Sequence, residues 1–197
     1  MPPRLAAPRL ALRQAALLVL LAGPAAVEPG AAFGQARPGP TLDNLLTALR
    51  NAPSEDAAAA LEAQIRMQWV EAASPALRLL LVRGLREIGD GQPGDAVDSF
   101  DAALDLDPDL IEAWRGRAQA RSRLGDMAGA VRDIQEVLRR EPRSFAALQD
   151  LSRMAEARAD WRGALAAHQK LLEIDPHSPG GQARLRDLKR RALGDDT

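Results

Sequence analysis

The chain has no cysteine and no tyrosine among its 197 residues, and aromatic side chains make up only 3% of it. Without cysteine the chain has no disulfide bond and no thiol nucleophile, so its stability must come from packing alone. The formal net charge is −1, and no run of basic residues is interleaved with stacking aromatic rings. The sequence therefore does not suggest a nucleic-acid partner.

Signature motifs of catalysis are also missing. The chain has no GxSxG elbow, no P-loop and no dinucleotide fingerprint after a strand. His168 and His177 have no metal-ligand motif around them; we expect His168 to pack in a seam between helices and His177 to be solvated. Asp105, Asp107 and Asp109 alternate around a helix end, but the glycine and closing glutamate of a calcium loop are absent. The sequence predicts a protein that is not an enzyme and has no metal site and no cofactor.

Long hydrophobic runs are missing as well. The apolar run Ala15–Ala22 is far shorter than the roughly 20 residues needed to span a bilayer. Arginines precede it and the small residues of Gly34-Gln35-Ala36 follow it, an order typical of a cleaved export signal. We therefore predict a signal peptide over residues 1–36, cleaved after Ala36, with a disordered Ala/Pro/Arg-rich tail as the alternative. Because this segment contains three Arg and one Glu, the mature chain would have a net charge of −3, with no membrane span and a periplasmic or secreted location.

What the chain does contain is a repeat of 34 residues. Pro108, Pro142 and Pro176 stand 34 residues apart, and an acidic residue precedes each of them. Three further series keep this interval: Ala96, Ala130 and Ala164; Leu104, Leu138 and Leu172; Gly84, Ala118 and Ser152. A period in this range indicates stacked supersecondary units rather than one closed globule. The small residues predict that the two helices of each unit approach closely.

Helical periodicity and turn residues divide the chain into segments. A linker at residues 37–40 precedes an N-terminal helical hairpin over residues 41–73, which lacks the alanine and proline of the later units. Three repeat units follow over residues 77–177, and residues 178–197 hold an amphipathic helix that would cover the open end of the stack. The helices expected in the three units are 77–88 and 94–106, 110–124 and 127–140, and 145–158 and 161–174.

The repeat resembles the tetratricopeptide repeat family, and the middle unit is the best match. Its matching positions are Trp114, Ala118, Gly125, Asp126, Ala130, Ile134, Leu138 and Pro142. The resemblance covers about residues 76–177 and implies an all-α fold: a right-handed superhelical stack of antiparallel helix hairpins, with about three repeats between an N-terminal helix pair and a C-terminal capping helix. The departures from the family pattern are Arg83 and Arg117 in place of Leu, and Glu87, Arg121 and Ala155 in place of Tyr. We expect these changes to thin the packing inside each hairpin.

The resemblance also implies where a partner binds, because the first helices of such arrays line a concave face that takes an extended peptide or a helix. The residues that correspond to this inner face are Leu81, Leu85, Arg115, Gln119, Ser122, Gln149 and Arg153. We hypothesise that Arg115 and Arg153 bind the carboxylates of an acidic or C-terminal segment, and that Leu81 and Leu85 take an apolar anchor. The alternative is that these arginines are simply solvated. The Lys–Asn pair of the family's carboxylate clamp is absent, so a chaperone-tail co-adaptor is not expected.

Three functions are compatible with these features. The leading hypothesis is a non-enzymatic scaffold or adaptor of the bacterial cell envelope that holds a protein or peptide partner. A second is a small-molecule or cell-wall accessory protein whose pocket lies between residues 41–73 and the first repeat. A third is self-assembly, in which the last helix undocks and the exposed seam pairs with another copy of the chain.

Overall fold

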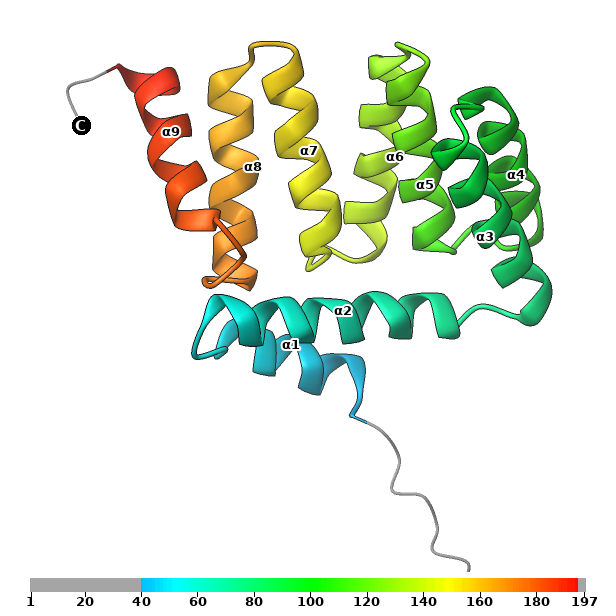
Figure 1. The fold of residues 1–197 in the computed structure, drawn as a ribbon, viewed down its shortest axis with the longest axis horizontal. Helices are drawn as coiled ribbons and strands as arrows, with labels where there is room; N and C mark the ends of the chain where they lie inside the picture. Colours follow the sequence, from blue (N-terminus) through cyan, green and yellow to red (C-terminus); the bar gives the residue numbers. More distant parts are fainter. Residues whose placement is uncertain (1–39, 195–197) are drawn as a thin grey trace, which may run out of the picture. The chain divides into compact units, whose positions relative to one another are not determined.

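The computed structural model describes residues 40–194, and these residues form nine α-helices (Figure 1). The predicted signal peptide and residues 37–39 of the predicted linker lie outside the described residues. The helices are α1 (Leu42–Arg50), α2 (Glu55–Glu71), α3 (Pro75–Gly89), α4 (Pro93–Leu106), α5 (Ile111–Arg123), α6 (Met127–Arg140), α7 (Phe145–Ala157), α8 (Trp161–Ile174) and α9 (Gly181–Leu193). Their bounds agree with the predicted ones to within two residues, and the all-α prediction is confirmed. None of these helices combines the length and the hydropathy needed to cross a membrane.

Short polar side chains and left-handed turn residues set the ends of the helices. The N-cap side chains that accept a hydrogen bond from a backbone N–H of the first turn are Thr41, Ser54, Ser74, Asp126, Ser144 and Asp160. The turn inside each repeat has one residue with positive φ: Gly91 (74°), Gly125 (83°) and Ala159 (56°). These residues are again 34 apart. Glycine adopts this conformation freely, whereas Ala159 adopts it at a steric cost.

The three repeats are antiparallel hairpins, α3–α4, α5–α6 and α7–α8, packed side by side (Figure 1). Phe100 of α4 is fully buried against the first helices of two neighbouring repeats. A Cβ atom at Gly84 would lie 2.7 Å from the Phe100 ring, and a Cβ atom at Gly116 would collide with the same ring. The predicted close approach at Gly84 is therefore confirmed, and Gly116 makes the same approach possible between the first and second repeats.

Charged groups stand inside the second repeat where the family pattern has Leu and Tyr. The guanidinium groups of Arg117 and Arg121 both donate to the buried carboxylate of Asp133, over N···O distances of 2.8–3.0 Å. Arg117 also pairs with Asp101 of the first repeat. Ion pairs therefore fill this hairpin, in place of the thinner packing expected from the sequence.

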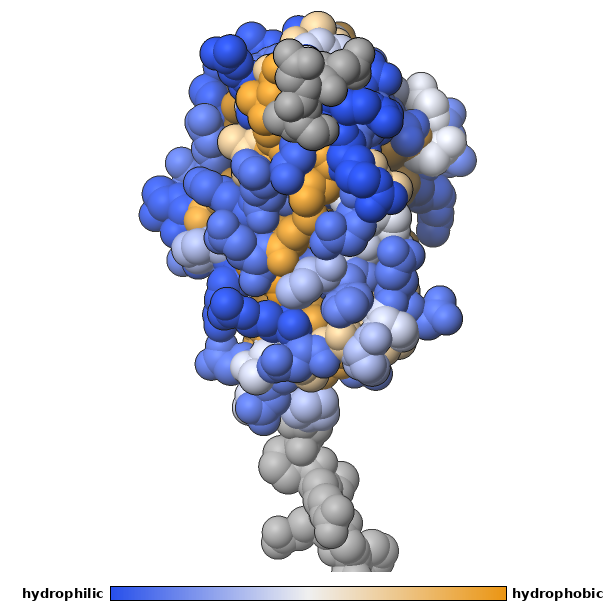
Figure 2. Space-filling view, turned by 90° about the vertical axis from the view of Figure 1, so that its left-hand side faces the viewer, coloured by the Kyte–Doolittle hydropathy of each residue, from blue (hydrophilic) through white to orange (hydrophobic). Residues whose placement is uncertain are grey.

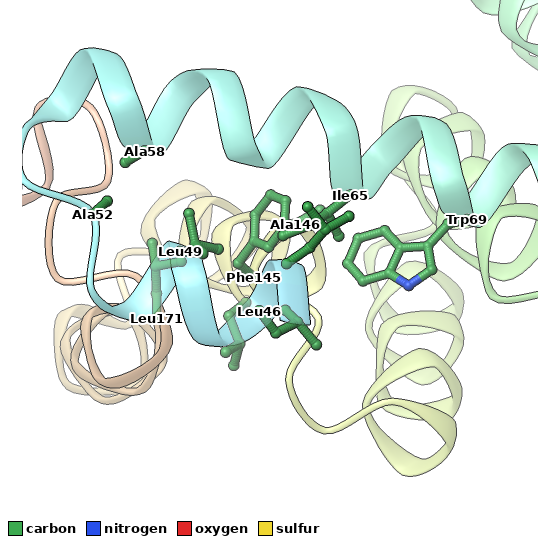
Figure 3. Packing of buried hydrophobic residues seen from close by; sticks show 11 residues of the cluster. Leu46, Leu49, Ala52, Ala58, Ile65, Trp69, Phe145, Ala146 and Leu171 are labelled. Atoms are coloured by element: carbon green, nitrogen blue, oxygen red, sulfur yellow. The ribbon is translucent and has the colours of Figure 1, made fainter. Parts of the chain in front are cut away.

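The N-terminal hairpin, α1–α2, lies across one edge of the row of repeats (Figure 1). Its apolar side chains form one core cluster with residues of the second and third repeats (Figure 3). Phe145 of α7 is fully buried between α1 and α2, and its ring stacks on Trp69 at a centroid distance of 5.5 Å. Only the end of α2, at Val70 and Ala73, packs on the first repeat. This arrangement corrects the expectation that residues 41–73 form a pocket with the first repeat.

The last helix, α9, covers the C-terminal end of the stack. Leu188 is fully buried in a cluster with Leu165 of α8, and the Arg191 guanidinium lies 4.7 Å from the centre of the Trp161 ring. Figure 2 views the molecule from this side and shows a mostly hydrophilic surface around a narrow apolar band. The predicted capping helix is thus in place and fills the seam that the self-assembly hypothesis requires to be open.

Candidate peptide-binding groove

Two adjacent hollows lie along the first helices of the second and third repeats. The hollow between α5 and α7 has a volume of about 370 Å³ and is lined by Gln119, Ser122, Arg123, Asp150, Arg153, Met154 and Ala157. The hollow between α7 and the loop leading into α9 has a volume of about 410 Å³ and is lined by Gln149, Ser152, Arg153, Glu156, His168, Leu171, Ser178, Pro179, Gly180, Gly181 and Arg184. Arg153 borders both hollows. We call them the α5–α7 hollow and the α7–α9 hollow, and together the groove.

Four of the seven predicted site residues line the groove: Gln119, Ser122, Gln149 and Arg153. The Arg153 side chain is 67% exposed, and its guanidinium donates to Asp150 over 2.5 Å. The amide of Gln149 donates to the Ser178 hydroxyl over 3.3 Å. The structure therefore brings together the polar part of the predicted site from two consecutive repeats.

The two predicted apolar anchors lie outside the groove. Leu81 is only 2% exposed, because it belongs to the hydrophobic core of the first repeat. It is therefore closed to a ligand, which corrects the expectation of an apolar anchor at this position. Leu85, one turn further along α3, is 47% exposed.

The predicted carboxylate ligand Arg115 is already engaged within the protein. Its side chain is 17% exposed, and its guanidinium contacts Glu112 at 2.8 Å and Asp150 at 3.5 Å. Burial disfavours the charge on Arg115, but the two carboxylates outweigh burial and raise its pKa above the ordinary value. Arg115 thus holds α5 against α7 and supports the groove from below, which corrects the prediction that it meets the partner.

Arg123 is the groove residue that the sequence analysis missed. It lies at the end of α5, lines the α5–α7 hollow and is exposed. Its guanidinium donates to the carbonyl oxygen of Ile88 over 2.8 Å rather than to a carboxylate. The signal was available, because Arg123 follows Gln119 by four residues and therefore shares its helix face.

Comparisons with known proteins agree with this architecture. No family model matches the chain. A TPR repeat-containing protein of Rhizobium etli is 28% identical over 156 residues, which cover 79% of this chain and 76% of that protein. The crystal structure of MamA protein superposes with a TM-score of 0.55 at 17% identity, over 79% of this chain and 82% of that chain. The first TPR of Spaghetti (RPAP3), solved bound to the HSP90 peptide SRMEEVD, superposes with a TM-score of 0.56 at 21% identity, over 59% of this chain and 95% of that chain.

By fold, the chain is a tetratricopeptide repeat protein. In this tetratricopeptide repeat protein the α5–α7 hollow has a positive charge excess. The guanidinium groups of Arg115, Arg123 and Arg153 surround it, against the carboxylates of Glu112 and Asp150. Asp150 is 4% exposed and lies beneath Arg153, so the charge that meets solvent is the cationic one.

The α7–α9 hollow of this repeat protein is closer to neutral. Arg184 donates to Glu156 over 3.0 Å, and both line the hollow. His168 is 5% exposed, and its Nε2 donates to the carbonyl oxygen of Gly181 over 2.8 Å. The expectation that His168 packs in a seam is therefore confirmed. Within residues 40–194, no group of three or more His, Cys, Asp or Glu side chains is arranged to hold a metal ion.

Proposed function

We propose that the chain is a non-enzymatic adaptor of the bacterial cell envelope that binds an extended acidic segment of a partner protein in the groove. The observation that supports this most strongly is the exposure of two guanidinium groups, Arg123 and Arg153, in one hollow between consecutive repeats. The fold supports the class of function, because tetratricopeptide arrays such as the first TPR of Spaghetti bind peptides.

The recognition chemistry follows from the side chains of the groove. Arginine presents a planar fork of N–H donors that matches a carboxylate, and such charge-assisted hydrogen bonds are stronger than neutral ones. The amides of Gln119 and Gln149, with the hydroxyl of Ser122, are positioned to bond the polar backbone of an extended chain. A segment with carboxylates spaced to reach Arg123 and Arg153 is the partner chemistry that fits.

The proposed place in the cell envelope rests on the sequence of residues 1–36. Intact-mass measurement of the protein recovered from a periplasmic extract tests it. A mass that corresponds to a chain beginning at residue 37 supports export and cleavage after Ala36. A mass that retains the first 36 residues, found with the cytoplasmic fraction, would contradict it.

The binding site is tested by screening an array of extended acidic peptides and then titrating the best binder. The Arg123→Glu, Arg153→Glu double variant should lose affinity about tenfold or more, because one hydrogen bond to a charged group contributes roughly 1.5–3 kcal/mol. A matched control is Arg132→Glu, Arg162→Glu, which reverses two exposed arginines on the second helices of the same two repeats. Equal loss in both variants would reduce the effect to net charge and would refute the groove as the site.

A further inference from the structure

The outer face of α3, at the first end of the stack, has large apolar side chains open to solvent. Leu79 is 73% exposed and Val82 is 50% exposed. The residues 34 positions later, Ala113 and Gly116 of α5, are buried. In the second repeat this helix face is therefore an interface, whereas in the first repeat the same face is uncovered by the described residues.

The interface between α4 and α5 shows what such a face is built to contact. There α4 places the ring of Phe100 on Gly116 and the carboxylate of Asp101 on Arg117. Arg83 is the counterpart of Arg117 on α3, and its side chain is 66% exposed. The α3 face thus repeats the register of an internal contact, with apolar residues in the centre and an arginine beside them.

The size of the side chains argues against a repeat-type helix as the occupant. Gly116 leaves room for the Phe100 ring, but Val82 at the same register fills that space. What fits against Leu79 and Val82 is a helix whose own branched side chains interlock with theirs as ridges into grooves. The α3 helix itself is such a helix.

The charges around the α3 face are of both signs, as a self-complementary interface requires. Arg83 and Arg86 lie on α3, while the first turns of α4 carry the exposed carboxylates of Asp95 and Asp98, whose field reaches Arg83. In a two-fold interface the same patch meets itself, so a patch of one sign would repel its copy. The far end of the stack offers no match, because the exposed side chains of α9 include Arg186 and Arg190, which would face the α3 arginines in a head-to-tail contact.

We propose that two copies of the chain pair through their α3 faces about a two-fold axis, burying Leu79 and Val82 of each copy. This contact leaves α9 docked, unlike the self-assembly expected from the sequence. It is independent of the groove, which lies on α5 and α7.

Sedimentation velocity of the full chain, from low to high micromolar concentration, tests the proposal. The wild type should shift from monomer to dimer with concentration, and Leu79→Glu, Val82→Glu should remain monomeric throughout. The matched control, Met67→Glu, Leu106→Glu, places the same charges on two exposed apolar positions of α2 and α4 and should dimerise like the wild type. Circular dichroism melts establish that all three proteins are folded.

Each other outcome overturns the proposal in a recognisable way. A monomeric wild type at every concentration excludes the second copy, and a photo-crosslinker at position 79 that then captures a different protein assigns the face to that partner. Dimerisation of residues 39–197 but not of the full chain assigns the face to the N-terminal segment instead. A dimer that survives Leu79→Glu, Val82→Glu places the interface elsewhere. Peptide binding by the groove is measured separately, so its failure does not bear on the dimer.

Discussion

The second and third repeats fill the same three positions inside their hairpins with opposite chemistry. In the second repeat these positions hold Arg117, Arg121 and Asp133, whose side chains form buried ion pairs. In the third repeat, 34 residues later, they are Leu151, Ala155 and Ala167. The backbone is the same, so the tetratricopeptide hairpin tolerates either an apolar interior or a charged one, provided that every buried charge has a partner.

The third repeat has its own buried carboxylate, but at its end rather than in its middle. Asp175 is fully buried where α2 meets the loop after α8, and neither of its oxygens has a hydrogen-bond partner of good geometry. The nearest charged group is a second carboxylate, that of Glu62 on α2, which pairs with Arg66 at 3.0 Å. Asp133 is thus stabilised in its ionised form by two guanidinium groups, whereas Asp175 faces a like charge.

This contrast has a consequence for protonation. Burial, and next the neighbouring Glu62, raise the pKa of Asp175 to about 7. The backbone at His177 and the hydroxyl of Ser178 favour the ionised form without reversing that shift. For Arg117 burial also opposes the charge, but its hydrogen bonds to Asp133 and Asp101 outweigh burial and raise its pKa. A buried charge in this fold therefore either finds its counter-ion or gives up its charge near neutral pH.

The largest effect is expected from removing the charge of Asp133. Asp133→Asn leaves the guanidinium groups of Arg117 and Arg121 without their shared partner and should lower the free energy of unfolding by about 3–5 kcal/mol. Urea unfolding followed by circular dichroism measures this. Asp105→Ala, at an exposed position of α4, is the control and should change stability by about 0.5 kcal/mol or less. A loss below about 1 kcal/mol for Asp133→Asn would mean that the ion pairs do not hold the hairpin.

The opposite sign is expected at Asp175. Because its pKa is about 7 in the folded state and 3.8 in the reference state, the folded chain binds more protons between these values, and this group makes stability fall as the pH rises through that window. Asp175→Asn should therefore flatten the pH profile and raise the melting temperature at about pH 8 by roughly 2–4 °C for each kcal/mol gained. Melting curves of both proteins at about pH 5 and pH 8 test this. A variant less stable than the wild type at the higher pH would contradict the account.

The first repeat offers an intermediate case, because Ser99 occupies the position of Asp133. Its hydroxyl donates to Glu87 over 2.6 Å and lowers the pKa of that carboxyl. Ser99→Ala should cost only about 1 kcal/mol, since Glu87 keeps its ion pair with Arg83 at 2.7 Å. Chemical unfolding beside Ser122→Ala, whose hydroxyl faces the groove, gives the comparison. A cost as large as that of Asp133→Asn would erase the distinction between the two repeats.

The smallest effect is expected at Glu62. Glu62→Gln removes the carboxylate that faces Asp175 but also removes the ion-pair partner of Arg66, whose side chain is 38% exposed. These changes oppose each other, so stability should change by about 1 kcal/mol or less. The pH dependence should nevertheless shrink, because one cause of the raised pKa is gone. Thermal melts beside the exposed control Glu71→Gln measure both, and an unchanged pH profile would exclude Glu62 as a cause.

The helices and their stacking could be predicted from the sequence because they depend on local signals. The 34-residue series, the caps and the turn residues each act within one hairpin, and they place every repeat helix to within two residues. The docking of the N-terminal hairpin could not be predicted in this way. It depends on Phe145 reaching Trp69, a contact between segments about half the chain apart that no periodic pattern records.

The same limit explains what was predicted correctly in the groove and what was not. Helical spacing alone identifies Gln119 and Arg153 as residues of one face. Spacing says nothing about Asp150, which lies on the next repeat and neutralises Arg115 across the helix interface. Leu81 was likewise assigned by register, but its burial depends on how the first repeat packs.

The most direct test of the central claim, that the groove holds the partner, is photo-crosslinking in the cell from position 149 of the groove and, separately, from position 132 on α6. The account predicts one partner adduct from position 149, lost in the Arg123→Glu, Arg153→Glu background and unaffected by Arg162→Glu. An adduct formed from position 132 alone, or one from position 149 that survives the double charge reversal, would contradict it.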